Sequence, residues 1–298
     1  MSAIRTNPNI LPDLIAALSQ LQQQQSTSTL ELATGSRINK PSDDPAGAAL
    51  LTQIDNLSGR VDSYQRSVGS IAGELQTADS TMNSVVEALQ RAISLGVEGA
   101  NGTLSDSDRA DVSAELSGIQ SQLISLANTS YQGQFIFAGT TGSQPYVIDP
   151  ASPSGVSYQG NNDVNFVTIG NAYQLQVNLP GSQIFNGAGA DVFQSMQSLI
   201  TALNTNSGID TAVTQLRTAY NNVNDQRVFY GNAINQTTAQ QTVLSTENLD
   251  LSQQQNTVGA ADLASVASQI VNDNIAQQAT LEAIGRAPQA SLFDYLRG

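Results

Sequence analysis

Apolar residues recur every seven positions along the second quarter of the chain, and no other feature constrains its fold as strongly. One series contains Ile54, Val61, Val68, Leu75, Met82 and Leu89. Its companion series contains Leu57, Tyr64, Ile71, Ala78, Val85 and Ala92. Two such series form one seam on a helix that supercoils around a partner. The pattern predicts a rod of about 60 Å, at about 1.5 Å per residue, that must bury its seam against another helix.

A second long helix is predicted near the end of the chain, from about residue 209 to residue 258. Its first series contains Ile209, Leu216, Val223, Tyr230, Thr237, Leu244, Leu251 and Val258. Its companion series becomes polar at Arg227, Gln241, Asn248 and Gln255. We interpret a seam of this kind as packed tightly on one side only, or packed against another subunit.

Between these helices the hydrophobic period changes. Ser105 and Asp108 have the spacing of a capping box, which predicts the start of a third helix. From about residue 134 to residue 184, alternating apolar residues separated by Gly and Pro predict short strands. The sequence therefore predicts a mainly α-helical fold, with long antiparallel coiled-coil-like helices from both halves of the chain and a small β domain inserted in the middle. We expect the helical core to form without this insert.

Both ends of the chain are predicted to be weakly amphipathic helices that need a partner, because each has a thin apolar stripe. The predicted assembly interface consists of Leu14, Leu18, Leu21, Leu263, Val266, Ile270, Leu281, Ile284, Leu292 and Leu296. The predicted domains are a terminal-helix domain (residues 1–44 with 259–298), a rod domain (residues 45–133 with 190–258) and a β domain (residues 134–189).

Composition excludes most enzyme chemistry. The 298 residues include no Cys and no His, so His-dependent triads, disulfides and the usual zinc sites are impossible. A formal net charge of −14 disfavours nucleic-acid binding, and no apolar run is long enough to cross a bilayer. We therefore predict no catalytic residue, cofactor, metal, nucleic-acid partner or membrane partner. Asp43 and Asp44 are interpreted as helix caps rather than as a cation site.

The segment from Leu32 to Leu50 has the composition of a joint between two helices. Gly35 is placed to end the first helix, and Pro45 to begin the second. The joint resembles the N-terminal signature of the bacterial flagellin superfamily through Gly35, Arg37, Asn39, Asp43, Asp44, Ala46 and Gly47. A second stretch farther along the chain resembles the same superfamily through Arg91 and Asn101. Two other stretches, from Tyr131 to Thr140 and from Leu292 to Leu296, resemble the hook–filament junction branch of that superfamily.

The resemblance implies a secreted, extracellular structural subunit of the bacterial flagellum at the hook–filament junction, exported unfolded and folded on assembly. It places the terminal helices in an inner tube, the long helices in the next shell and the β domain outside. The implied partners are the first hook-associated protein, flagellin, copies of the same chain in a ring and a flagellar export chaperone. Filament flagellin is the alternative within the superfamily. An enzyme carried in the β insert is the alternative from another class, but the insert is small and contains no His, Cys or acidic cluster.

Overall fold

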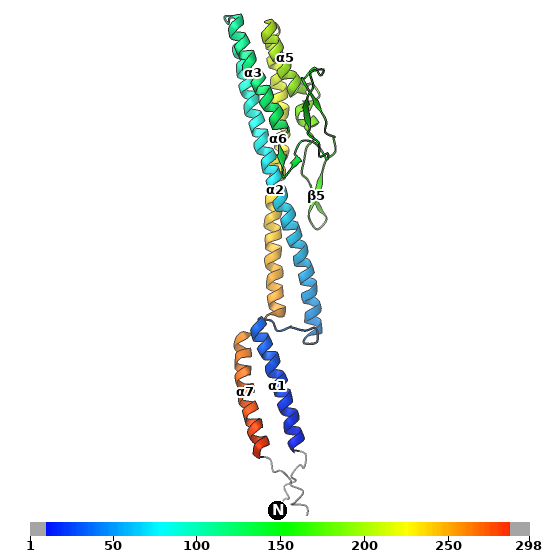
Figure 1. The fold of residues 1–298 in the computed structure, drawn as a ribbon, viewed down its shortest axis with the longest axis vertical. Coiled ribbons are helices and arrows are strands. Elements are labelled where there is room, and N and C mark those ends of the chain that lie inside the picture. Colours follow the sequence, from blue (N-terminus) through cyan, green and yellow to red (C-terminus); the bar gives the residue numbers. More distant parts are fainter. Residues whose placement is uncertain (1–9, 287–298) are drawn as a thin grey trace, which may run out of the picture. The chain divides into compact units, whose positions relative to one another are not determined.

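The computed structural model describes residues 10–286, whose ribbon is shown in Figure 1. Long helices with short β-hairpins inserted between them confirm the predicted fold class. The chain divides into two compact units, residues 1–59 with 248–298 and residues 60–247. Helices α2 (Pro45–Gly99) and α6 (Ile209–Gly259) contribute residues to both units.

The first unit is built on two antiparallel helices, α1 (Ile10–Thr34) and α7 (Leu263–Arg286), which pack side by side. The end of α1 lies beside the start of α7, because the Ala261 amide donates a 2.9 Å hydrogen bond to the Gly35 carbonyl oxygen. Farther along, the Gln25 side-chain amide donates to Asn274 Oδ1 at 2.8 Å. Helix α1 ends where Gly35 adopts a left-handed φ of +69°, a conformation that glycine takes at little steric cost.

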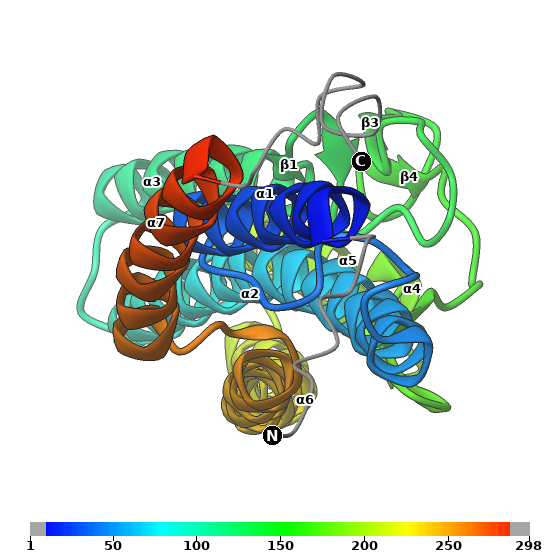
Figure 2. The same cartoon turned by 90° about the horizontal axis from the view of Figure 1, so that it is seen from below.

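The second unit contains α3 (Asp106–Ala127), α5 (Val192–Thr205) and the adjoining parts of α2 and α6. Figure 2 shows α6 end-on, with α2 beside it. Residues of the predicted heptad series are buried in the core of this unit, among them Leu75, Met82, Leu89, Leu216 and Val223. Helix α3 begins with the predicted capping box, in which Ser105 Oγ accepts from the Asp108 amide and Asp108 Oδ2 accepts from the Ser105 amide.

The strands of the described chain form two-stranded antiparallel hairpins between α3 and α5. They are β1 (Ser130–Tyr131) with β2 (Gln134–Phe135), β3 (Tyr146–Ile148) with β4 (Val156–Tyr158), β5 (Phe166–Gly170) with β6 (Tyr173–Gln176), and β7 (Asn186–Gly187) with β8 (Ala190–Asp191). A short helix, α4 (Gly181–Phe185), precedes β7. Both Figure 1 and Figure 2 show the strands on one side of the helices.

The hairpins share a buried aromatic core with the helices. The rings of Tyr146 and Phe193 have centroids 5.0 Å apart, and those of Phe137 and Phe185 have centroids 5.4 Å apart. All four side chains are fully buried, and Phe193 belongs to α5. Removal of the insert would uncover Phe193, so the structure argues against our expectation that the helical core forms without the insert.

Candidate assembly site

The joint between α1 and α2 ties the end of α1 to the end of α6 within the first unit. Ser36 forms an antiparallel bridge with Ala260, directly after α6. The Arg37 amide donates to the Gly259 carbonyl oxygen at 2.8 Å, and the Arg37 guanidinium donates to the Val258 carbonyl oxygen at 3.0 Å. These bonds satisfy carbonyl groups that the last turn of a helix leaves without an intrahelical partner.

Asp44 and Gly47 form the start of α2. Asp44 Oδ1 accepts a 2.9 Å hydrogen bond from the Gly47 amide, and Asp44 Oδ2 accepts a 3.0 Å hydrogen bond from the Arg37 guanidinium. The Gly47 amide first, and then Arg37, lower the pKa of the Asp44 carboxyl by stabilising its charged form. A Cβ at Gly47 would lie 2.5 Å from Ile38 Cδ1, so a larger residue at this position requires Ile38 to move.

Asn39 and Asp43 order the loop between these two ends. Asn39 Nδ2 donates to the Ser36 carbonyl oxygen at 2.7 Å, and Asn39 Oδ1 accepts from Thr34 Oγ1 at 2.8 Å. Asp43 Oδ2 accepts from the main-chain amides of Asn39 and Lys40, at 3.1 and 2.8 Å. Asp44 therefore caps α2 through the Gly47 amide, whereas Asp43 accepts only from loop amides and caps neither helix. Within residues 10–286, no group of three or more His, Cys, Asp or Glu side chains is arranged to hold a metal ion.

The remaining signature residues have different surroundings. Ala46 is exposed in the first turn of α2. Arg91 on α2 donates through Nε and Nη2 to Glu115 Oε1 on α3, at 2.9 and 2.7 Å. This ion pair is half exposed, so its contribution to stability is at most about 1 kcal/mol. Asn101 lies in the turn between α2 and α3, where its Oδ1 accepts from the Thr103 amide at 3.2 Å.

Most described residues of the predicted assembly interface are at least half-buried, and Val266 alone among them is fully buried. The half-buried or buried ones are Leu14, Leu18, Leu21, Val266, Ile270 and Ile284. Leu263 and Leu281 are instead exposed to solvent. The predicted residues Leu292 and Leu296 lie outside the described part of the chain. The predicted stripe therefore serves first to hold the two terminal helices together.

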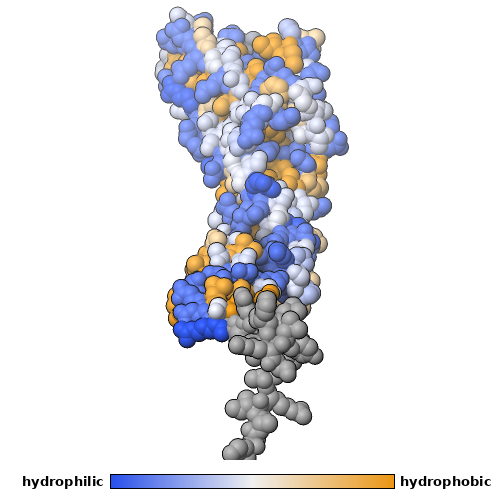
Figure 3. Space-filling model, turned by 60° about the horizontal axis from the view of Figure 1, so that its bottom comes forward, coloured by the Kyte–Doolittle hydropathy of each residue, from blue (hydrophilic) through white to orange (hydrophobic). Residues whose placement is uncertain are grey.

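Further apolar residues on the terminal helices lie outside the predicted assembly interface. On α7, Val271 and Ile275 are 58% and 62% exposed, and on α1 Leu11 and Ile15 are also exposed. Each couple is four residues apart, so its members lie on one side of their helix. Figure 3 shows apolar patches interrupting the polar surface. The spacing could have revealed this face, but the sequence does not say which of two stripes meets the neighbouring helix.

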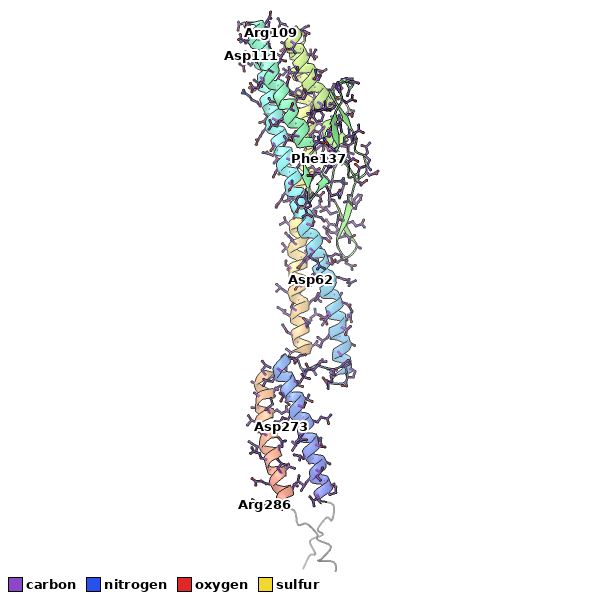
Figure 4. All side chains as sticks on the ribbon, in the orientation of Figure 1. Asp62, Arg109, Asp111, Phe137, Asp273 and Arg286 are labelled. Carbon is purple, nitrogen blue, oxygen red and sulfur yellow. The ribbon has the colours of Figure 1, made fainter. Side chains whose placement is uncertain are left out.

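The buried side of α7 contains a polar defect. Asp273 Oδ2 is buried and has no hydrogen-bond partner among the described residues. Figure 4 labels Asp273 on α7. A buried polar atom that loses its hydrogen bonds to water costs on the order of 1–3 kcal/mol, and more when the group is charged. The contact between α1 and α7 is therefore weaker than its half-buried leucines alone would make it.

The polar companion seam of α6 finds partners within the chain. Arg227 donates to the Asp79 carboxylate at 2.8 and 3.2 Å and to Asn83 Oδ1 at 2.8 Å. Gln255 donates to Asp55 Oδ1 at 3.0 Å. Both residues pair with α2, so neither requires another subunit to satisfy its side chain.

Within residues 10–286, none of the helices is both long and apolar enough to cross a membrane. The bacterial flagellin N-terminal helical region, as a family pattern, matches residues 13–141, which contain the joint, α2 and α3. Flagellar hook-associated protein 3 of Salmonella typhimurium is 30% identical over 201 residues, which are 66% of this chain and 62% of that protein. The aligned part therefore spans less than two thirds of that relative.

Two further comparisons cover more of the relative. Flagellar hook-associated protein 3 of Escherichia coli is 25% identical over 290 residues, which are 88% of this chain and 90% of that protein. The crystal structure of flagellar hook-associated protein 3 from Legionella pneumophila has a similar fold, with a TM-score of 0.63 at 13% identity. That likeness covers 70% of this chain and 98% of the other.

The chain is therefore similar to the flagellin family of bacterial flagellar proteins. Within that family it is similar along most of its length to flagellar hook-associated protein 3. Both findings confirm the resemblance predicted from the joint segment.

Proposed function

We propose that this chain is a non-enzymatic structural subunit that joins the flagellar hook to the filament, outside the cell. The observation that carries the proposal is the similarity to hook-associated protein 3 of Escherichia coli along 88% of the chain. The joint supports it, because its hydrogen bonds fix how the chain leaves α1 and enters both α2 and α7. A subunit that transmits force between two polymers needs such fixed connections between its helices.

The outer face of the terminal helices is the proposed contact with neighbouring subunits. This face contains Leu11, Ile15, Val271 and Ile275, which are exposed in the single chain. Apolar faces of this kind are buried when helices of different subunits pack together. The buried defect at Asp273 keeps the α1–α7 pair weakly stable, which suits a chain that is exported unfolded and gains order on assembly.

The proposed arrangement follows the predicted domains. Residues 1–44 with 259–298 would line an inner tube, residues 45–133 with 190–258 would form the next shell, and residues 134–189 would lie outside. The proposed partners are the first hook-associated protein on one side, flagellin on the other, and copies of the same chain in a ring. A flagellar export chaperone would hold the chain before export.

Filament flagellin is the second candidate function. The observation that favours it is the match of residues 13–141 to the N-terminal helical region of bacterial flagellin. The two candidates differ in self-association, because a filament subunit extends a polymer of itself and a junction subunit is bounded by other proteins.

A polymerisation assay separates the two candidates. Purified protein should add to isolated hooks only when the first hook-associated protein is present, and it should form no long fibres after seeding. Ile275→Asp should prevent this addition, because an uncompensated charge in an apolar interface costs several kcal/mol. Asn272→Asp places the same charge on an exposed polar position of α7 and should leave addition intact. Long homopolymeric filaments in electron micrographs would identify the chain as a flagellin instead.

A further inference from the structure

The chain contains two Asn–Gly dipeptides, Asn101–Gly102 and Asn186–Gly187. The first is exposed in a turn, whereas the second is half-buried in a hairpin. Glycine after asparagine leaves the next main-chain nitrogen without a neighbouring Cβ, so that nitrogen can approach the asparagine side chain. We propose that Asn101 is a site of spontaneous deamidation, whereas Asn186 is protected from the same reaction by its contacts. This proposal does not rest on the proposed function.

The surroundings of Asn101 leave the reacting atoms accessible. Asn101, Gly102 and Thr103 are all exposed in the turn that follows α2. A Cβ built on Gly102 meets no atom within 4 Å, so the space around this residue is open. No hydrogen bond donated by the Gly102 amide is found within the described chain. The side-chain oxygen of Asn101, Oδ1, accepts hydrogen bonds from the Thr103 amide and hydroxyl. These hydrogen bonds draw electrons away from Asn101 Cγ, the carbon that the nitrogen attacks.

The reaction needs only water. The deprotonated Gly102 main-chain nitrogen forms a bond to Asn101 Cγ, the bond from Cγ to the side-chain nitrogen breaks, and that nitrogen leaves as ammonia. The product is a five-membered succinimide ring. Water then opens the ring at either carbonyl carbon, which gives aspartate or, with the main chain rerouted through the side chain, isoaspartate.

Asn186 is an internal comparison because both ends of its side-chain amide are engaged. Its Oδ1 accepts a 2.6 Å hydrogen bond from the Tyr146 hydroxyl, and its Nδ2 donates a 2.8 Å hydrogen bond to Asp191 Oδ2. The residue is half-buried and its main chain lies in the β7–β8 hairpin. Rotation of this amide toward the Gly187 nitrogen would break both hydrogen bonds.

Deamidation at Asn101 would alter the connection between α2 and α3. The Leu104 amide donates a 3.1 Å hydrogen bond to the main-chain carbonyl oxygen of Asn101, and this bond closes the turn. The Leu104 carbonyl oxygen in turn accepts from the buried Arg109 guanidinium at 2.7 Å. Isoaspartate lengthens the main chain by one carbon, so it would displace both bonds. A carboxylate at this position would also stand at the C-terminal end of α2, where the helix dipole disfavours negative charge.

The test incubates the purified full-length protein at mildly alkaline pH and measures both sites by peptide mass spectrometry and by enzymatic methylation of isoaspartate. In the folded protein, Asn101 should convert at least about tenfold faster than Asn186, equivalent to about 1.4 kcal/mol of barrier. In concentrated urea the two rates should become similar, because the contacts of Asn186 are then lost.

Gly102→Ala is the matched variant. Its methyl group meets open space and Gly102 has no positive φ, so the fold should be unchanged by circular dichroism. The added Cβ should hinder the attacking nitrogen and slow conversion of Asn101 by at least about tenfold, with the rate at Asn186 unchanged. Equal rates at the two sites in the folded protein, or a Gly102→Ala variant that converts as fast as the wild type, would overturn the proposal.

Discussion

Gly35→Ala tests whether the end of α1 depends on backbone conformation alone. Gly35 has a φ of +69°, and a Cβ built on it meets no atom within 4 Å. The methyl group therefore causes no clash, and its whole effect comes from the left-handed conformation. That conformation costs an L-residue roughly 1–2 kcal/mol, so Gly35→Ala should destabilise the first unit by that amount.

The same substitution elsewhere in the first unit should have the opposite sign. Gly59 lies on α2, is exposed, has no positive φ and also has no atom within 4 Å of a built Cβ. Gly59→Ala should stabilise the unit by about 1 kcal/mol, because alanine has the higher helix propensity. Gly35→Asn should recover part of the loss at position 35, since asparagine tolerates the left-handed conformation better than alanine does.

Amide exchange at Ala261 reports this change locally. The Ala261 amide donates to the Gly35 carbonyl oxygen, so opening of the joint releases it. A loss of one to two kcal/mol corresponds to roughly 5–30-fold faster exchange in Gly35→Ala, while Gly59→Ala should not accelerate it. Urea unfolding of the full chain, followed by helical circular dichroism, gives the matching stability change. Stabilisation by both alanine variants would refute the argument that a left-handed glycine fixes the joint.

Two further predictions concern half-buried carboxyl groups. Burial raises the pKa of Glu74 above its ordinary value of 4.5, so the folded state is penalised progressively as pH rises through that range. Glu74→Gln should therefore raise the melting midpoint at neutral pH but not below about pH 4.5. An equal gain at every pH would contradict the stated cause. Asp273→Leu should stabilise the α1–α7 pair by about 1–3 kcal/mol in urea unfolding, and a loss of stability would show that its carboxylate has an unseen partner.

Sequence reasoning succeeded where one residue pattern has one structural solution. The six-heptad series of α2 predicts burial of Leu75 and Met82 because no other arrangement removes so many apolar side chains from water. The capping box at Ser105 and the left-handed Gly35 are local in the same sense, since their geometry depends on a few adjacent residues.

The failures occurred where a residue's partner is distant in the sequence. For Arg227, its own helix left packing on one side and packing against another subunit both open, because its partner Asp79 is 148 positions away. The ring contact between Tyr146 and Phe193 joins the insert to α5, and no local pattern in the sequence indicates it, so the insert looked separable. On the terminal helices, both stripes were present in the sequence, but only packing decides that Val266 is buried and Ile275 is exposed.

The location of the chain on intact flagella tests the central claim most directly. An epitope-tagged copy, expressed in a strain that lacks the untagged gene, should be labelled by immunogold in a narrow band between hook and filament. The tagged copy should also restore filaments that stay attached to hooks, whereas the same copy with Ile275→Asp should not. Gold particles distributed along the whole filament would contradict the account and show that the chain is a filament subunit.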